Sequence, residues 1–163
     1  MTAPAEGVVY RSPGAEGLAQ ARAFVEHVAS DCDQAARNAH TAGASREAGF
    51  DPERDSLLTA ERDGRLVGAL LITRDPADSE AARVHWLVVD PPARNGGVGR
   101  ELLFRGIRLC RERGLLVLRA WSLATSPAAP RLFWLYGFRV VDLSPVTIGD
   151  GTRESIHFEK RLR

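Results

Sequence analysis

The sequence predicts an α/β fold of the α+β sandwich type, in which a mixed, mostly antiparallel central sheet of about six to seven strands is flanked by helices. Strand-like segments alternate with helical ones without a repeating strand-helix-strand pattern, and Asp63-Gly64 marks a tight antiparallel hairpin. The chain has 163 residues, of which 44% are hydrophobic, so it is long enough to enclose one core. We therefore expect a single domain over residues 1–163.

The first part of the chain predicts a short strand followed by helices. Residues 7–11 predict the strand, and Pro13-Gly14 ends it. Apolar residues then recur at helical spacing, at Leu18, Ala21, Phe24, Val25 and Val28. The continuation to His40 is alanine-rich and more polar, which indicates a second helix that ends in the segment 41–45.

The next segments predict a three-stranded meander. Residues 57–62 and 65–73 are the two arms of the hairpin, and Asp-Gly between them favours a type I′ turn. Residues 82–89 have the β-branched and aromatic bias of a central strand. The pair Pro91-Pro92 ends this strand.

The helix expected at 99–113 is the clearest in the chain. Leu103, Ile107 and Cys110 lie along one of its faces and arginines along the other, and Gly114 follows as a left-handed cap. The remaining elements are a buried strand, a short helix opened by Ser126 and Pro127, and two closing strands. They are expected at 115–121, 127–135, 138–143 and 154–161.

Charge and cysteine content exclude several functional classes. The 22 basic and 21 acidic side chains give a net charge of +1, so no electrostatic footprint for nucleic acid or an anionic membrane is present. Lys160 is the only lysine, so phosphate binding would rely on arginines and backbone amides. Cys32 and Cys110 lie far apart, which predicts neither a metal site nor a disulfide. No apolar run reaches the roughly 18 residues of a membrane span, and we expect a cytoplasmic protein with a small-molecule partner.

A glycine-rich turn, Arg94-Asn95-Gly96-Gly97-Val98-Gly99, connects the strand ending at Val89 to the best helix. At such a junction, backbone N–H groups and the positive end of the helix can bind phosphate. A Rossmann fingerprint would require glycine where Leu102 stands, and a Walker loop would require Gly-Lys-Ser/Thr, which is absent. Taken alone, the turn is equally compatible with a plain strand-to-helix connection.

The segment 88–103 resembles the acyl-CoA signature of GNAT acetyltransferases, whose pattern is Arg/Gln-x-x-Gly-x-Gly/Ala. A second landmark at the right distance, the segment 129–138, is similar to the helix that ends in Gly-Phe in that family. The resemblance implies a GNAT-like fold and an N-acetyltransferase that transfers an acetyl group from acetyl-CoA to a primary amine of a small molecule or protein. It implies no metal, and it makes a homodimer possible.

The same resemblance implies where the cofactor binds. The backbone of the last residues of the strand would bind the pantetheine arm, the amides of the glycine-rich turn would bind the diphosphate, and an arginine would add charge. Ser126 lies near where relatives bind pantetheine or substrate, although a helix cap is an alternative role. The expected cofactor-binding residues are Leu87, Val88, Val89, Arg94, Asn95, Gly96, Gly97, Val98, Gly99, Arg100 and Ser126.

The sequence departs from the family where many relatives carry a tyrosine acid. Phe133 stands at that position, four residues before Gly137. Tyr136 is the candidate replacement, with a packed aromatic as the alternative. A coenzyme A thiol resembles a cysteine thiol, with a pKa of about 8.5, so the thiolate can also leave without an acid.

His85 is the candidate base. By strand alternation it shares a face with Leu87 and Val89, and imidazole suits proton transfer near neutral pH. The alternative is a strand histidine satisfied by its neighbours, and Arg83 on the same face would repel a substrate ammonium. The missing tyrosine motivates a rival function, a non-catalytic acyl-CoA-binding regulatory module.

Overall fold

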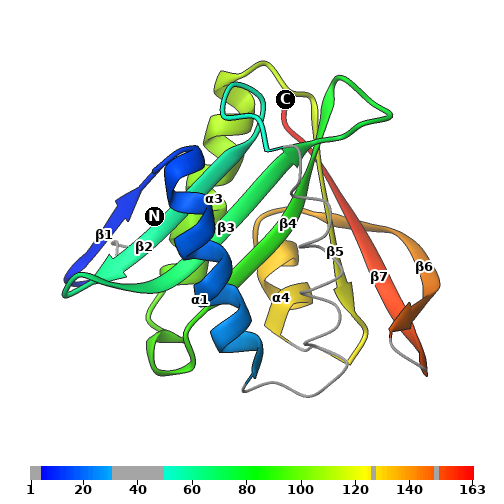
Figure 1. Cartoon of the computed structure of the whole chain (residues 1–163). Helices are drawn as coiled ribbons and strands as arrows, with labels where there is room; N and C mark the ends of the chain where they lie inside the picture. Colours follow the sequence, from blue (N-terminus) through cyan, green and yellow to red (C-terminus); the bar gives the residue numbers. More distant parts are fainter. Residues whose placement is uncertain (1–4, 31–49, 126–127, 149–150) are drawn as a thin grey trace.

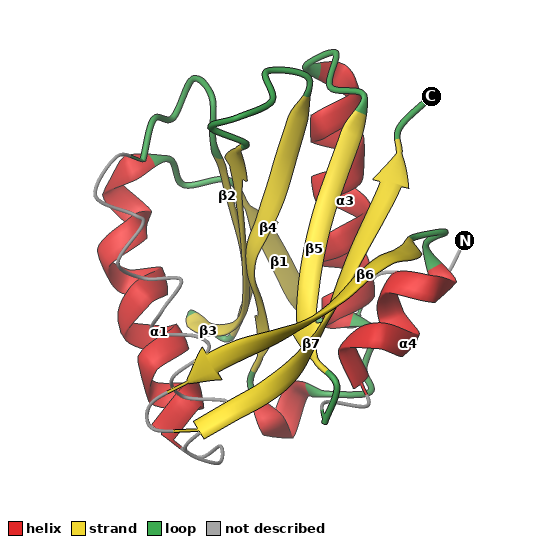
Figure 2. Ribbon diagram, turned by 90° about the vertical axis from the view of Figure 1, so that its right-hand side faces the viewer, coloured by secondary structure: helices red, strands yellow, loops and turns green. Residues whose placement is uncertain are grey.

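The computed structural model describes residues 5–30, 50–125, 128–148 and 151–163. They form a sheet of seven strands in the order β1-β2-β3-β4-β5-β7-β6. Helix α1 covers one face of the sheet, and α3 and α4 lie on the other (Figure 1, Figure 2). Only the β4–β5 pair is parallel among the strand pairs of the described residues. The predicted fold class is confirmed.

The first four strands form an antiparallel unit. Asp63 and Gly64 both have positive φ, 52° and 74°, as the predicted type I′ turn requires. The meander therefore begins with the tight hairpin that the sequence indicates. The strands are β1 (Val8–Arg11), β2 (Ser56–Arg62), β3 (Arg65–Arg74) and β4 (Ala81–Val89).

The described helices agree with the prediction to within about a residue. They are α1 (Leu18–Ser30), α3 (Val98–Glu112) and α4 (Ala128–Leu135). The second front helix expected up to His40 falls in 31–49, outside the described residues. None of the described helices is long and apolar enough to cross a membrane.

The last strands differ from the prediction at their ends. Strand β5 (Val117–Leu123) begins later than expected, because the Leu115 amide still bonds to the Cys110 carbonyl behind Gly114. Strands β6 (Arg139–Ile148) and β7 (Gly151–Arg161) form a hairpin that is longer than predicted. Pro145 interrupts the strand pattern in the sequence but is tolerated in β6, because an edge strand can leave the missing amide facing outward.

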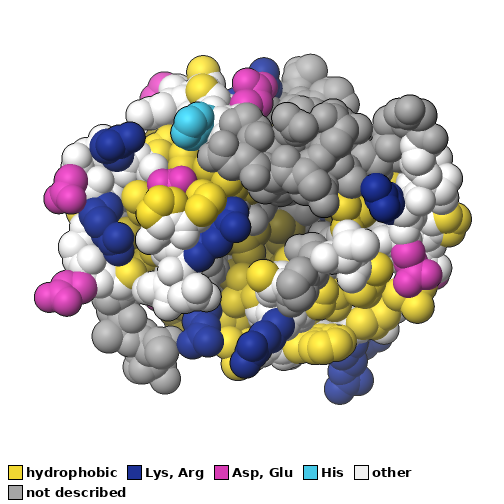
Figure 3. All heavy atoms as spheres, turned by 90° about the horizontal axis from the view of Figure 1, so that it is seen from below, with side chains coloured by type: hydrophobic (Ala, Val, Ile, Leu, Met, Phe, Trp, Pro, Cys, Tyr) yellow, Lys and Arg dark blue, Asp and Glu magenta, His cyan; other side chains and the backbone are white. Residues whose placement is uncertain are grey.

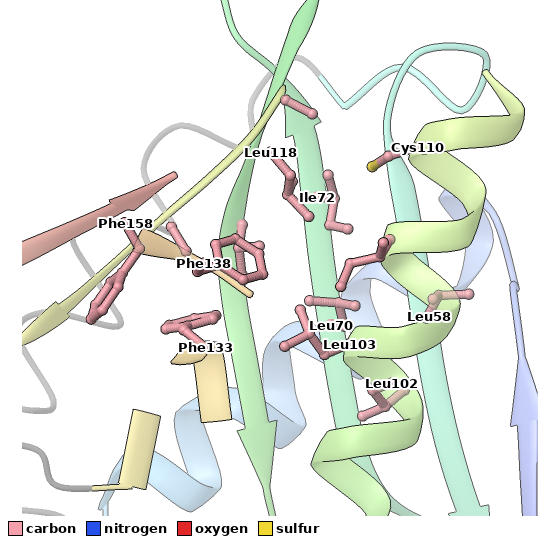
Figure 4. Packing of buried hydrophobic residues seen from close by; sticks show 14 of the residues in the cluster. Leu58, Leu70, Ile72, Leu102, Leu103, Cys110, Leu118, Phe133, Phe138 and Phe158 are labelled. Atoms are coloured by element: carbon pink, nitrogen blue, oxygen red, sulfur yellow. The ribbon is translucent and has the colours of Figure 1, made fainter. Parts of the chain in front are cut away.

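Helix α3 lies unusually close to the sheet, and two glycines allow this. A Cβ on Gly106 would lie 2.7 Å from Leu70 Cδ2 and 2.8 Å from Ile72 Cδ1. A Cβ on Gly68 would lie 2.9 Å from side-chain atoms of both Val98 and Leu102. The main core fills this interface and extends to the phenylalanines of α4 and β7 (Figure 4).

Candidate functional site

Strands β4 and β5 pair over a short stretch and then separate. The parallel ladder joins Ala81–Arg83 to Val117–Arg119. Beyond it, β4 continues to Val89 and β5 to Leu123, and the two strands diverge toward the lower end of the molecule (Figure 1). Seen from that end, hydrophobic side chains line a hollow, and basic side chains lie farther out on the same face (Figure 3). The divergence leaves a gap whose facing backbone edges have no strand partner in the described structure.

The glycine-rich turn lies at the open end of this gap. After a 3-10 turn at Pro91–Ala93, the exposed Arg94 donates from Nε to the Val89 carbonyl at 3.0 Å, which ties the turn to the end of β4. Asn95 and Gly97 have positive φ, 63° and 86°. Gly97 is the N-cap of α3 and has no side chain to cap it. The turn therefore presents backbone rather than side chains at the start of the helix.

The backbone amides of this turn are available to a ligand. The first helical hydrogen bond of α3 runs from the Glu101 amide to the Gly97 carbonyl at 3.0 Å. Within the described part of the chain, the amides from Asn95 to Arg100 donate no hydrogen bond. A 15-residue helix adds its positive end at the same place. Consecutive free amides at a helix N-terminus form an anion-binding site.

The predicted cofactor residues meet where β4, α3 and α4 converge. A Cβ on Gly99 would lie 3.4 Å from Val89 Cγ2 and 3.7 Å from Leu132 Cδ2, so the turn packs between β4 and α4. Leu87 and Val89 pack toward the α3 side, whereas Val88 is buried against α1. Ser126 lies outside the described residues.

Comparison with known proteins agrees with this geometry. Residues 22–138 match the model of the acetyltransferase (GNAT) family. The chain belongs to this family. Its sequence is 33% identical over 143 residues to a mycothiol acetyltransferase of Thermomonospora curvata, covering 82% of this chain and 44% of that protein. The same figure of 33% holds for a mycothiol acetyltransferase of Sanguibacter keddieii, with 91% of this chain and 49% of the relative covered. The chain thus spans about half the length of these relatives or less.

Solved GNAT structures share the fold. The ribosomal-protein-S18-alanine N-acetyltransferase of Escherichia coli superposes with a TM-score of 0.73 and 20% identity, covering 95% of this chain and 94% of that chain. A putative acetyltransferase from Salmonella typhimurium, solved with its cofactor acetyl-CoA, gives a TM-score of 0.74 and 19% identity, covering 97% of this chain and 95% of the other.

One polar group in the gap was not among the expected cofactor-binding residues. Ser122 lies on β5, beyond the last residue that pairs with β4. Its side chain is buried, and its Oγ has no hydrogen-bond partner in the described structure. Strand alternation places it with Leu118 and Ala120 on the core-facing side, where a hydroxyl is unusual. That alternation was the signal available in the sequence.

His85 does not share a face with Leu87 and Val89, so this prediction is wrong. The register between β3 and β4 shifts there, because Leu71 pairs with Trp86 but Ile72 pairs with Val84. His85 is the extra residue of a β-bulge, which breaks the alternation of side chains along the strand. It therefore lies on the α1 face of the sheet.

The α1 face holds a pocket of about 250 Å³ around His85. Basic side chains dominate its charged lining, although acidic side chains of the segment before β2 also contribute. Asp55 is already engaged, because its carboxylate accepts hydrogen bonds from the amides of Asp51 and Arg74. The pocket is lined by Phe50, Asp51, Arg54, Asp55, Leu71, Thr73, Arg74, Pro76, Arg83 and His85.

Phe133 and Tyr136 have different surroundings on α4. Phe133 is in the core, with its ring 5.1 Å from that of Phe138 and 5.2 Å from that of Phe158 (Figure 4). Tyr136 is half-buried at the end of the helix, near the first turn of α3. Burial is the main cause of its raised pKa, which Arg100 opposes and Glu101 reinforces. Tyr136 therefore keeps its proton at neutral pH and can donate it.

No described cluster of His, Cys, Asp and Glu side chains has the composition of a metal site. Cys110 lies on the buried, core-facing side of α3, and burial raises the pKa of its thiol to about 11. The thiol is therefore protonated and unreactive at neutral pH.

Proposed function

We propose that this protein is an N-acetyltransferase that transfers an acetyl group from acetyl-CoA to a primary amine of a small molecule or protein. The observation that carries the proposal is the gap between β4 and β5. This gap ends at a turn in which the backbone N–H groups from Asn95 to Arg100 donate no hydrogen bond within the described structure. A long, thin ligand with an anionic middle and a thioester end has the shape and charge that this arrangement accepts.

The chain's own groups account for binding of the diphosphate and the pantetheine arm of such a ligand. The amides of the turn and the start of α3 bind the diphosphate, with exposed Arg94 and Arg100 adding positive charge. The backbone of residues 87–89 bonds to the amides of the pantetheine arm in the manner of an added strand. The unpartnered Ser122 hydroxyl supplies a further hydrogen bond from β5. The residues present therefore fit acetyl-CoA.

The transfer itself requires positioning and proton transfer. A deprotonated amine attacks the thioester carbonyl, an amide of β4 stabilises the oxyanion, and the C–S bond breaks. Tyr136 has a hydroxyl near the start of α3 that can protonate the leaving thiolate. Because a thiolate of this basicity also leaves unaided, Phe133 in the core does not argue against an enzyme.

Calorimetric titration with acetyl-CoA and with free CoA tests the cofactor site. A Cβ on Gly97 would meet no protein atom within 4 Å, so the site has room for a larger side chain. Gly97→Trp therefore places an indole beside the free backbone N–H groups of the turn, where it would block a ligand. Gly114→Trp is the matched control. Gly114 also has positive φ, 73°, and equally open surroundings, but it lies at the other end of α3. Both variants place a side chain at a positive φ, so only loss of binding specific to Gly97→Trp supports the site.

Thiol release then separates the enzyme from a binding module. Wild-type protein is assayed with acetyl-CoA and a panel containing a polyamine, an amino sugar, free amino acids and peptides with a free N-terminus. Release above hydrolysis with any amine supports the enzyme. Tight binding without release would support the regulatory module instead, and absence of binding would refute both.

A further inference from the structure

A histidine outside the predicted site lies in a hydrogen-bond cluster on the closing hairpin. His157 Nε2 is 3.0 Å from Ser144 Oγ and 2.9 Å from Ser155 Oγ. The Ser155 hydroxyl also donates to the Ser144 carbonyl at 2.9 Å, and its residue is 2% exposed. The ring of His157 is half-buried. Two serines therefore fix the orientation of this imidazole.

The hydrogen bonds also favour one tautomer of the neutral ring. A hydroxyl has one proton, and that of Ser155 is used on the Ser144 carbonyl. Toward His157, the Ser155 oxygen can then only accept, and the tautomer with its hydrogen on Nε2 satisfies this contact. In the neutral ring, Nδ1 is left with its lone pair. In the described structure, Nδ1 has no hydrogen-bond partner.

The position of His157 relates it to the gap between β4 and β5. Its neighbours Ile156 and Phe158 pack into the core on the α3 side, so His157 lies on the opposite face of the sheet. It pairs with Trp121 of β5, two residues beyond Arg119, where the ladder to β4 ends. His157 thus lies one strand away from the gap, just past the level at which the gap opens.

Charged side chains of both signs lie around His157, as they do around His85. Asp142 of β6 is its partner in the register, Glu159 is on the same face of β7, and Arg139 of β6 is the partner of Glu159 on that face. Arg119 on that face of β5 is paired with Asp75, Asp78 and Glu159. Across the gap, the pocket of His85 is lined by Arg54, Arg74 and Arg83 and also by Asp51 and Asp55.

We infer that His157 is the base that deprotonates the acceptor ammonium on the α1 side of the gap. The inference rests on the proposed function. Nδ1 takes one proton from the ammonium and later releases it to solvent. The amine nitrogen forms a bond to the thioester carbonyl carbon as the C–S bond breaks, and the second proton of the nitrogen ends on the thiolate. Ser144 and Ser155 hold the ring in the tautomer that can accept this proton.

The decisive variant is His157→Gln, whose amide N–H can still donate to the serines but whose side chain accepts no proton at neutral pH. His27→Gln is the matched control, because His27 is exposed on α1 and lies outside the hydrogen-bond cluster of His157. His85→Gln tests the alternative base. Each is measured for melting temperature, acetyl-CoA affinity by calorimetry, and thiol release with the best amine of the panel.

For His157→Gln we expect kcat to fall by about 100-fold, with acetyl-CoA affinity and melting temperature near those of the wild type. The wild-type kcat/KM should rise with pH and reach a plateau, and the variant should lose that plateau. The charged neighbours of His157 remain in the variant and serve as internal controls for this profile; they are Arg119, Arg139, Asp142 and Glu159, with Arg83 and His85 across the gap.

Two results would overturn the inference while leaving the proposed function intact. One is a His157→Gln enzyme with the wild-type kcat and pH profile, and the other is a loss confined to His85→Gln. If the glutamine variant melts early, His157→Asn is measured in the same way, and a wild-type rate there has the same meaning. A wild-type protein that releases no thiol with any amine would refute the inference and the proposed function together.

Discussion

Arg83 of β4 and Arg119 of β5 are the last residues that face each other in the parallel ladder between these strands, and the buried carboxylate of Asp75 bonds to both side chains. Asp75 accepts from Arg83 Nε and from Arg119 Nη1, each at 2.7 Å, and its side chain is 0% exposed. Two like charges on neighbouring strands are thus held together by one carboxylate. This contact lies at the apex of the gap and fixes where the strands begin to separate.

Asp75→Asn should therefore destabilise the fold. The change removes the charge but leaves the two guanidinium groups side by side, and we expect a loss of about 2–3 kcal/mol in urea denaturation. Asp78→Asn is the matched control, because Asp78 bonds to Arg119 at 3.0 Å but is 35% exposed. Its loss should stay below about 1 kcal/mol. Equal losses in the two variants would contradict a special role for the buried carboxylate.

The same carboxylate predicts a dependence of stability on pH. Burial alone would raise the pKa of Asp75, but hydrogen bonds from Arg83, Ala77 and Arg119 outweigh it and lower the pKa from 3.8 to about 2. Because the folded-state pKa is lower than the unfolded one, the stabilisation is complete above about pH 4 and is lost as pH falls toward 2.

Urea denaturation of the wild type and Asp75→Asn between pH 6 and about pH 2 measures this contribution. The difference in unfolding free energy between them should shrink by about 2 kcal/mol across that range. A difference that stays constant with pH would show that Asp75 has its ordinary pKa in the folded protein.

The tight contact between α3 and the sheet gives a prediction about cofactor binding. In Gly68→Ala, the new methyl would meet Val98 and Leu102 at 2.9 Å, which displaces the start of α3. We expect a loss of about 1–3 kcal/mol in stability and weaker acetyl-CoA binding by calorimetry, since the amides at that end bind the diphosphate.

Gly106→Ala is the matched control for this change. Its methyl would meet Leu70 and Ile72 even more closely, but in the middle of α3. Part of that strain is offset by the better helix propensity of alanine. Stability should fall, and acetyl-CoA affinity should change by less than about 2-fold. Comparable losses of affinity in both variants would mean that the position of the helix start does not govern binding.

The sequence predicted the order of the described elements, the hairpin turn and the glycine-rich turn, because these depend on local patterns. It placed His85 on the wrong face of β4, because the bulge depends on the pairing with β3 and cannot be recognised from the pattern of residues along β4 alone. It ended the sixth strand too early, because Pro145 breaks a strand pattern unless the strand is an edge. Whether a strand lies at the edge or in the middle of the sheet cannot be predicted from its local sequence.

The long-range contacts of the site were also beyond local patterns. From the sequence, Asp75 is expected to be a turn residue, and only the folded structure brings its carboxylate between Arg83 and Arg119. His157 lies 13 residues from Ser144, which the closing hairpin brings to its ring. A homodimer and a cytoplasmic location stay predictions, as does the role of Ser126.

Ser122→Ala is expected to act in opposite directions on stability and on binding. The buried hydroxyl has no partner in the described structure, so the folded protein without ligand bears its desolvation penalty. Replacing it by a methyl group should raise the unfolding free energy by about 1 kcal/mol, seen as a higher melting temperature. A merely structural serine with a satisfied hydroxyl would give the reverse sign.

Binding should weaken in the same variant. If the Ser122 hydroxyl bonds to the pantetheine arm, its loss removes a neutral hydrogen bond of about 0.5–1.5 kcal/mol, or roughly 2- to 12-fold in acetyl-CoA affinity. Adenosine 3′,5′-bisphosphate lacks the pantetheine arm, and its affinity should not change. A stabilised variant that binds both ligands as the wild type does would show that the arm does not reach Ser122, and equal weakening for both would place the effect in the turn at Gly97 instead.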